Sequence, residues 1–347
     1  MVPANAPKFP AIKASLCVIV AFLLLLPWIV RDEYYIHSMT IILLFAYFAS
    51  SWNIIGGFAG QLSLGHAAYV GLGAYTSSLL FIRWGISPWL GMFPGAGVGA
   101  IAAVILGYPC FRLRGPYFAL STLSFAMILL DIVLSTQEFA GFDIRGAMGL
   151  HIKQLGDSPA YYQFGHNWQF YYIILTMLFM AIGVSYLIGH SKLGSYLSAV
   201  REDQDIAASV GVNPARSKIF ALMISAFLTS LGGTFLAQIQ LYVEPFQFFG
   251  IGLSIEIALG AIIGGIGTLM GPVIGAILLR SISEVSRIYL GGMYTGAHLI
   301  LYGVILILVM MYLPHGILKP LERMMGNFFK KGQGSEKYPR LRNEEKV

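Results

Sequence analysis

Long apolar stretches separated by short polar segments make up most of this chain of 347 residues. Each stretch is close to the roughly twenty residues that an α-helix needs to cross about 30 Å of hydrocarbon. The pattern therefore predicts an all-α polytopic membrane protein with about ten transmembrane helices. We place these helices at residues 14–30, 38–56, 61–82, 87–108, 117–136, 169–189, 218–240, 251–268, 270–289 and 296–313.

One polar segment, residues 194–218, interrupts this pattern and is too charged to cross a bilayer. Its Gly211 is a helix stop, and Asn213 followed by Pro214 is typical of a helix restart. The apolar residues before the stop recur at helical spacing, which predicts one short amphipathic helix with the charges mostly on its other face. These apolar residues are Leu197, Val200, Ala207 and Val210.

Lysine and arginine residues concentrate on one side of the predicted membrane. With both termini cytoplasmic, most of the 22 Lys and Arg residues fall in cytoplasmic segments, as the positive-inside rule requires. This orientation predicts a cytoplasmic N-terminal tail at 1–13, a transmembrane domain at 14–318 and a basic cytoplasmic C-terminal tail at 319–347. Within the transmembrane domain, 190–217 is then a cytoplasmic loop and 137–168 an external loop.

Composition and charge exclude several other classes. Hydrophobic residues make up 57% of the chain and charged residues 11%, with a mean hydropathy of +0.73. The net charge of +6 follows from the positive-inside bias, so it does not indicate a nucleic-acid partner. Cys17 and Cys110 lie beside or inside apolar stretches, so we predict neither a disulfide framework nor a metal site. The first stretch lacks a cleavage site and is predicted to stay as a helix.

Glycines and polar residues gather where the second and third predicted helices meet, at residues 53–74. One interpretation is a broken or re-entrant helix beside a substrate path, because irregular backbone at membrane depth occurs only inside protein or along a wet cavity. The other is close helix packing through small residues, with a buried, hydrogen-bonded histidine. For the first interpretation we assign six residues to the path, namely Asn53, Gln61, Ser63, His66, Tyr117 and Thr122.

Glycines at four-residue spacing in the fourth and ninth predicted helices predict packing seams. They are Gly91, Gly95 and Gly99 in the fourth, and Gly267, Gly271 and Gly275 in the ninth.

Few charges lie inside the predicted helices, and each is a candidate functional residue. Arg280, Glu284 and Arg287 are spaced so that they can pair on one helical face, which favours a structural triad. Asp131 and Glu256 lie near predicted helix ends, where they can reach water. A proton relay would instead require them to be deep and to face a cavity.

The chain lacks the G-x-x-x-x-G-K-[ST] motif that binds ATP phosphates, and also H-E-x-x-H and G-x-S-x-G. Nothing in the sequence therefore predicts a P-loop ATPase or an intramembrane enzyme. If ATP drives this protein, another chain supplies the ATPase.

Five motifs, in order along residues 38–320, resemble the LivM-type permease subunits of bacterial branched-chain amino acid ABC importers. They are GGFAGQLSLGHAAYVGLGAYTSSLL from Gly56, RGPYFALSTLSFAMIL from Arg114, AVREDQDIAASVGVNPARSKIFALMISAFLTSLGGTF from Ala199, EIALGAIIGGIGTLMGPVIGA from Glu256 and YLPHGIL from Tyr312.

The resemblance implies a bacterial inner-membrane permease that works with a homologous second permease, two ABC ATPase subunits and a periplasmic binding protein. ATP and Mg²⁺ are then used by the ATPase subunits, and this chain binds no cofactor. The family's coupling loop corresponds to residues 199–211. The residues that it assigns to ATPase coupling are Ala199, Arg201, Glu202, Asp203, Asp205, Ala207, Ala208 and Gly211.

We thus predict the import of branched-chain or related amino acids. One alternative is an ABC permease for urea or short amides, because AGFDIRGAMGL at 140–150 departs from the family pattern. Another is a stand-alone ion-coupled transporter that uses Asp131 or Glu256. A membrane scaffold without transport is disfavoured by the glycine-broken segments.

Overall fold

The computed structural model describes residues 21–30, 32–111, 113, 115–139, 141–290, 303, 304, 307 and 311. Both predicted tails, Arg112 and Arg114 lie outside the described residues. So do the start of the first predicted helix and nearly all of the last one, at 296–313.

The described chain is mostly helical, and residues 21–29 are also helical. The helices are α2 (Glu33–Asn53), π-helix η1 (Ile54–Phe58), α3 (His66–Trp84), α4 (Pro88–Cys110), α5 (Pro116–Ser135), α6 (Asn167–Gly189), α7 (Lys192–Glu202), α8 (Gln204–Ser209), α9 (Pro214–Gln240), α10 (Pro245–Phe249), α11 (Ile251–Gly265) and α12 (Gly271–Leu290). Two antiparallel pairs, β1 (Glu138–Phe139) with β2 (Phe142–Asp143) and β3 (Leu150–His151) with β4 (Tyr242–Val243), lie in the loops, with 3₁₀ turns η2 (Gly146–Met148) and η3 (Pro159–Tyr161).

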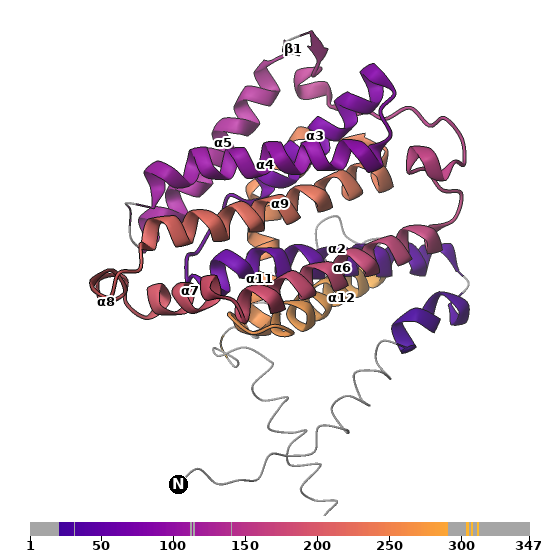
Figure 1. Ribbon diagram of the computed structural model, residues 1–347. Coiled ribbons are helices and arrows are strands. Elements are labelled where there is room, and N and C mark those ends of the chain that lie inside the picture. The colour runs from indigo at the N-terminus through magenta and orange to yellow at the C-terminus, as the bar shows by residue number, and fades with distance from the viewer. Residues whose placement is uncertain are drawn as a thin grey trace, which may run out of the picture.

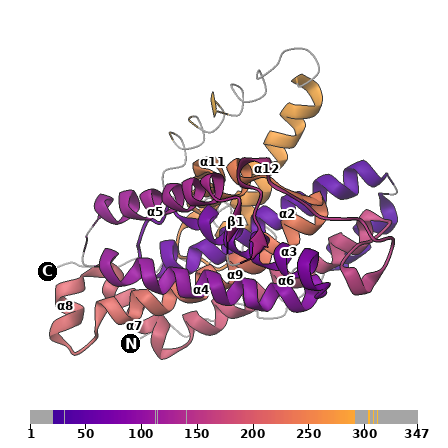
Figure 2. The ribbon, with the colours of Figure 1, turned by 90° about the horizontal axis from the view of Figure 1, so that it is seen from above.

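The long helices form two groups that run side by side (Figures 1 and 2). In one group α3, α4 and α9 pack together, and in the other α2 packs with α6, α11 and α12. Contacts between α2 and α9 join the groups, and there the Tyr47 hydroxyl donates a hydrogen bond to the Leu228 carbonyl. Most of the fully buried side chains lie on α2, α3 and α9, so the core follows these three helices.

Glycines allow the closest helix contacts, as the sequence predicts. In α4, a Cβ on Gly95 would lie 2.9 Å from the Gly73 carbonyl oxygen of α3, and a Cβ on Gly99 would overlap Ser230 of α9. Gly271 and Gly275 of α12 pack directly on the α11 backbone. The predicted seam in α12 was wrong in one respect, since Gly267 lies in the turn before the helix.

Among the described residues, six helices are long and apolar enough to cross a membrane, which indicates a multi-pass membrane protein. They span Glu33–Phe58, Pro88–Cys110, Pro116–Ser135, Asn167–Gly189, Pro214–Gln240 and Pro245–Gly265. Two further predicted spans form helices that are less apolar. α3 begins at His66 and contains several hydroxyl residues, while α12 contains three charged residues.

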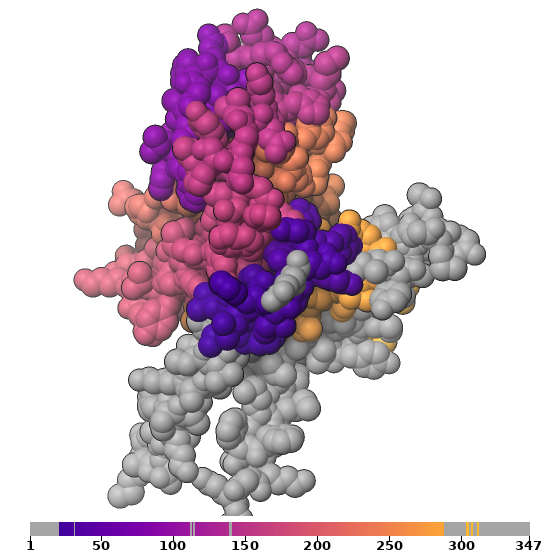
Figure 3. Space-filling model, turned by 90° about the vertical axis from the view of Figure 1, so that its right-hand side faces the viewer, coloured from indigo at the N-terminus to yellow at the C-terminus, as the bar shows by residue number. Residues whose placement is uncertain are grey.

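The segment 190–217 and the loop 137–168 lie at opposite ends of the helix bundle (Figure 1). Figure 3 looks onto the end with the loop, whose side chains spread across much of that face. The loop is anchored to the bundle because β3 pairs with β4, just after α9. The ring of Tyr162 is fully buried and packs edge-on against Trp89, Phe170 and Phe235.

Candidate functional site

A break between α2 and α3 introduces partly buried irregular backbone beside α7. After Asn53 the chain forms one π-helical turn, and then it runs without helix from Ala59 to Gly65. Two side chains bind this irregular backbone: the Trp52 indole N–H donates to the Ser63 carbonyl (2.8 Å), and the Leu64 N–H donates to the Thr122 hydroxyl (3.0 Å). These bonds supply the partners that irregular buried backbone needs.

His66 is the first residue of α3 and is completely buried. Its Nε2 lies 2.9 Å from the Ser225 hydroxyl, which itself donates to the Ser51 carbonyl (2.7 Å). Ser225 therefore accepts a hydrogen bond from Nε2–H, and Nδ1 accepts a hydrogen bond from the Ser63 hydroxyl at 3.2 Å. Both ring nitrogens thus have hydrogen-bond partners within the protein. This agrees with the second interpretation given above, a buried and hydrogen-bonded histidine.

Asn53 also binds backbone across the break. Its amide nitrogen donates to the Thr268 carbonyl, and its oxygen accepts from the Gly267 N–H, both at 2.9 Å. Gln61 is buried and its side chain donates to the Ala59 carbonyl (3.3 Å). Five of the six predicted path residues thus gather around the break, whereas Tyr117 is 68% exposed on α5.

The segment 190–217 forms two short helices, so the prediction of one helix over 199–211 was wrong. α7 ends at Glu202, and the carboxylate of Asp203 accepts hydrogen bonds from the N–H groups of Asp205 (2.8 Å) and Ile206 (3.0 Å). Asp203 thereby caps α8, and a capping residue has non-helical backbone, which breaks the helix.

The predicted apolar stripe is only partly buried. Leu197, Val200 and Ala207 are buried, but Val210 is 72% exposed, and Ile206 of α8 is also exposed. Gly211 follows the C-terminal cap of α8 with a φ of +88°. The side chain of Asn213 accepts from the Arg216 N–H, and Pro214 begins α9, which confirms the predicted stop and restart.

A hollow of about 530 Å³ lies beside α8. Its walls include Asp205, Ala208 and Gly211 of the predicted coupling residues, together with Asn213 and Phe111. Glu202 and Asp203 are exposed nearby, and Ala199 is half-buried in α7. The side chain of Arg201 is exposed, as predicted, and its guanidinium also donates to the Gly57 carbonyl of η1 (2.8 Å).

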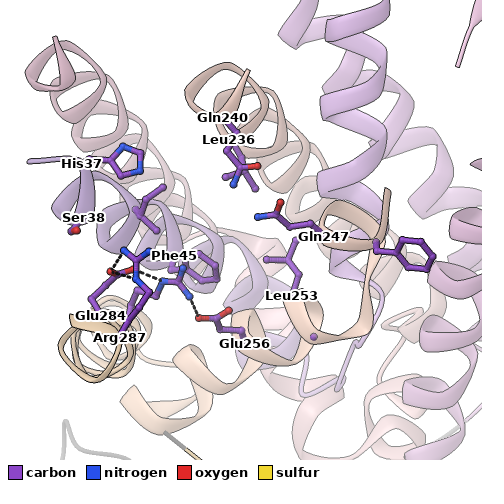
Figure 4. Close-up of a pocket in the computed structure, with 14 residues that line it drawn as sticks. His37, Ser38, Phe45, Leu236, Gln240, Gln247, Leu253, Glu256, Glu284 and Arg287 are labelled. Atoms are coloured by element: carbon purple, nitrogen blue, oxygen red, sulfur yellow. Dashed lines mark hydrogen bonds and ion pairs between the residues drawn. The ribbon is translucent and has the colours of Figure 1, made fainter. Parts of the chain in front are cut away.

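The charged residues of α11 and α12 meet in a second cavity of about 530 Å³ (Figure 4). Arg280 forms an ion pair with Glu256, and its guanidinium lies 4.2 Å from the centre of the Phe45 ring. Glu284 accepts from Arg287 at 2.7 Å and lies 3.9 Å from Arg280. The predicted triad is present, and Glu256 joins it.

Asp131 is not part of this cluster, since it is exposed on α5, one turn before the helix ends.

The described residues hold no group of three or more His, Cys, Asp or Glu side chains that could bind a metal ion.

Two features of this site were not predicted from the sequence. Ser225, the partner of His66, was missed, although a hydroxyl in the apolar helix α9 was a signal for a buried polar contact. The contact between Arg201 and the break was also missed. It joins residues 144 positions apart, so no local pattern in the sequence indicates it.

Comparison of the sequence with known protein families identifies one that matches most of the chain. The family described as the permease component of branched-chain amino acid transport systems matches residues 34–310. The chain belongs to this family. The match covers every helix from α2 to α12, including the break and both short helices of the 190–217 segment.

Among curated relatives, the chain is 28% identical to the high-affinity branched-chain amino acid permease protein LivM of Escherichia coli, with 92% of this chain and 80% of the relative covered. It is 24% identical to LivH of the same organism, with 79% and 91% covered. A fructose import permease protein of Rhizobium meliloti is 27% identical over 57% of this chain and 55% of its own length. No solved structure matches.

Proposed function

We propose that this protein is a permease subunit of an ATP-driven importer in the bacterial inner membrane, and that it moves branched-chain amino acids into the cytoplasm. The family membership and the similarity to LivM and LivH support this proposal. The relative named for fructose import indicates that permeases of related sequence serve different substrates. The substrate is therefore tested separately below.

The ATPase subunits bind the 190–217 segment in this proposal. Ile206 is 65% exposed and Val210 is 72% exposed, and both belong to α8 or its C-terminal cap. These two exposed branched side chains, next to a hollow of about 530 Å³, offer an apolar contact for a partner protein. The segment lies at the end of the bundle where we predict the cytoplasm, and the chain has no ATP-binding motif of its own. This exposed apolar surface is the observation that carries the proposal.

The homologous second permease packs against α5. Only 28% of the apolar window of α5 is buried, compared with 72% for α9. Its exposed face carries Tyr117, Ser124 and Asp131, which are seven residues apart and therefore share one side of the helix. A carboxylate that faces lipid is costly, so a protein or a water-filled path on this side stabilises the helix.

The periplasmic binding protein docks on the loop 137–168 at the opposite end. This loop is held in place by the pairing of β3 with β4. It presents exposed apolar side chains, including Met148 and Leu155. ATP and Mg²⁺ are used by the ATPase subunits.

The decisive experiment asks whether the exposed apolar surface of α8 binds an ATPase. The full complex is reconstituted with its ATPase subunits, second permease and binding protein, and the uptake of radiolabelled leucine is measured. Val210→Glu is expected to abolish both ATPase co-purification and ATP-dependent uptake, because it places a charge in an apolar contact. The chain itself is expected to fold, since Val210 is exposed.

Leu155→Glu is the matched control for ATPase co-purification, since it makes the same change at an exposed residue at the other end of the bundle. Normal co-purification and normal uptake with Val210→Glu would overturn the assignment of the ATPase site. Uptake by this chain alone, driven by an ion gradient without ATP, would establish the secondary transporter instead. Competition of leucine uptake by urea or short amides, and not by isoleucine or valine, would refute the proposed substrate.

A further inference from the structure

The side chain of Arg201 crosses from α7 to the break between α2 and α3. Its Nη1 donates a hydrogen bond of 2.8 Å to the carbonyl of Gly57. Gly57 lies in η1, at the C-terminal end of the helix that begins with α2. Carbonyls in the last turn of a helix lack intrahelical partners and carry the negative end of the helix dipole. An arginine is therefore a suitable partner for this carbonyl.

Glycines surround the arginine, and any larger residue would displace it. A Cβ on Gly60 would lie 2.9 Å from Cγ of Arg201, and a Cβ on Gly267 would overlap its Nη1. Both glycines have left-handed backbone, with φ of +65° and +78°, so they also avoid the strain that another residue would have there. We call Gly57, Gly60 and Gly267 the glycine slot.

The contact of Arg201 with the glycine slot joins α7 to two segments that are far apart in the sequence. Gly57 and Gly60 belong to the break after α2, and Gly267 belongs to the turn between α11 and α12. Asn53 fastens these two segments to each other through its bonds to Gly267 and Thr268. A movement of α7 therefore reaches two interrupted helices at once, through a single side chain.

We infer that Arg201 is a positioning residue for transport, and that its bond in the glycine slot transmits movement of the 190–217 segment to the break between α2 and α3. This inference rests on the proposed function, in which the ATPase subunits contact α8. α7 and α8 are joined at Asp203 and contact each other, so force applied to α8 acts on the helix that carries Arg201.

The test compares Arg201→Gln and Arg201→Lys with the wild type in the complete reconstituted complex. Arg201→Gln is expected to keep ATPase co-purification but to lower leucine uptake per ATP hydrolysed by about fivefold. A fivefold effect is below the range for a hydrogen bond to a charged group, because Arg201 is exposed and water screens its bond. Arg201→Lys keeps one donor and the charge, so an intermediate ratio is expected.

A glycine pair provides the matched control. Gly60 and Gly85 have the same φ of +65°, but a Cβ on Gly85 meets nothing within 4 Å. Gly60→Ala is expected to lower uptake per ATP, and to add little when Arg201 is already Gln. Gly85→Ala carries the same backbone strain and is expected to leave the ratio unchanged.

Two results would overturn the inference. The first is a normal ratio of uptake to ATP hydrolysis in Arg201→Gln. The second is loss of ATPase co-purification in Arg201→Gln, since Arg201 would then bind the ATPase itself. In the first case, loss of ATPase binding by Val210→Glu would still support the proposed function, so the failures of the two proposals are distinguishable.

Discussion

The ion pair between Glu256 and Arg280 offers a test of whether the buried charges serve structure or ion transport. Glu256→Gln removes one of two carboxylates from a cluster that also holds two guanidinium groups, so the cluster changes from neutral to a net positive charge. Arg280 would retain the Phe45 ring at 4.2 Å and Glu284 at 3.9 Å. If the pair serves structure, Glu256→Gln is expected to lower the stability of the protein, while the molecules that remain folded still transport leucine.

The exposure of the pair sets the expected magnitude. Breaking a fully buried ion pair costs about 3–5 kcal/mol, whereas an exposed pair contributes about 0–1 kcal/mol. The side chains of Glu256 and Arg280 are both 22% exposed, and Glu284 offsets part of the loss. We therefore expect Glu256→Gln to lower the free energy of unfolding by about 1–3 kcal/mol.

The assay is a double-mutant cycle of Glu256→Gln, Arg280→Gln and the double variant, with unfolding followed by SDS titration in mixed micelles. The double variant removes both charges and is expected to be more stable than the sum of the single effects predicts, by about 1–2 kcal/mol. Leucine uptake per folded molecule is measured on the same proteins. A coupling energy of zero would refute the structural role, and loss of uptake in a variant of unchanged stability would assign Glu256 to ion transport.

Two further predictions concern a hydrogen bond at the break and the packing of α4 on α3. Thr122→Val is expected to lower the free energy of unfolding by about 1–2 kcal/mol, because the Leu64 N–H loses its partner; Thr122→Ser keeps the hydroxyl, and equal stability of the two variants in SDS titration would contradict the explanation. Gly95→Leu is expected to reduce the yield of monodisperse protein in fluorescence-detected size exclusion, because its Cβ would lie 2.9 Å from the Gly73 carbonyl oxygen. Gly97→Leu, in the same helix with nothing within 4 Å, is the control, and an equal loss there would point to helix propensity instead of packing.

Local patterns were sufficient for the class of protein and for several helix ends. Apolar stretches of about twenty residues report membrane helices because the bilayer sets their length. Gly211 and the Asn213–Pro214 restart were predicted because caps act on backbone groups within a few residues. The break at Asp203 also had a local signal, since Asp is a preferred N-cap, but the acidic run around it was interpreted as one helical face.

Contacts between distant segments were decided by the tertiary structure alone. Glu256 and Arg280 are 24 residues apart, and His66 and Ser225 are 159 apart, so neither pairing leaves a periodic pattern. Arg201 is exposed, as the helical pattern predicts, but its contact with the break was missed because periodicity describes the face of a residue and not the reach of a long side chain. Periodicity depends on neighbours within two turns of a helix, whereas the glycine slot exists only because packing brings the break and the α11–α12 turn together.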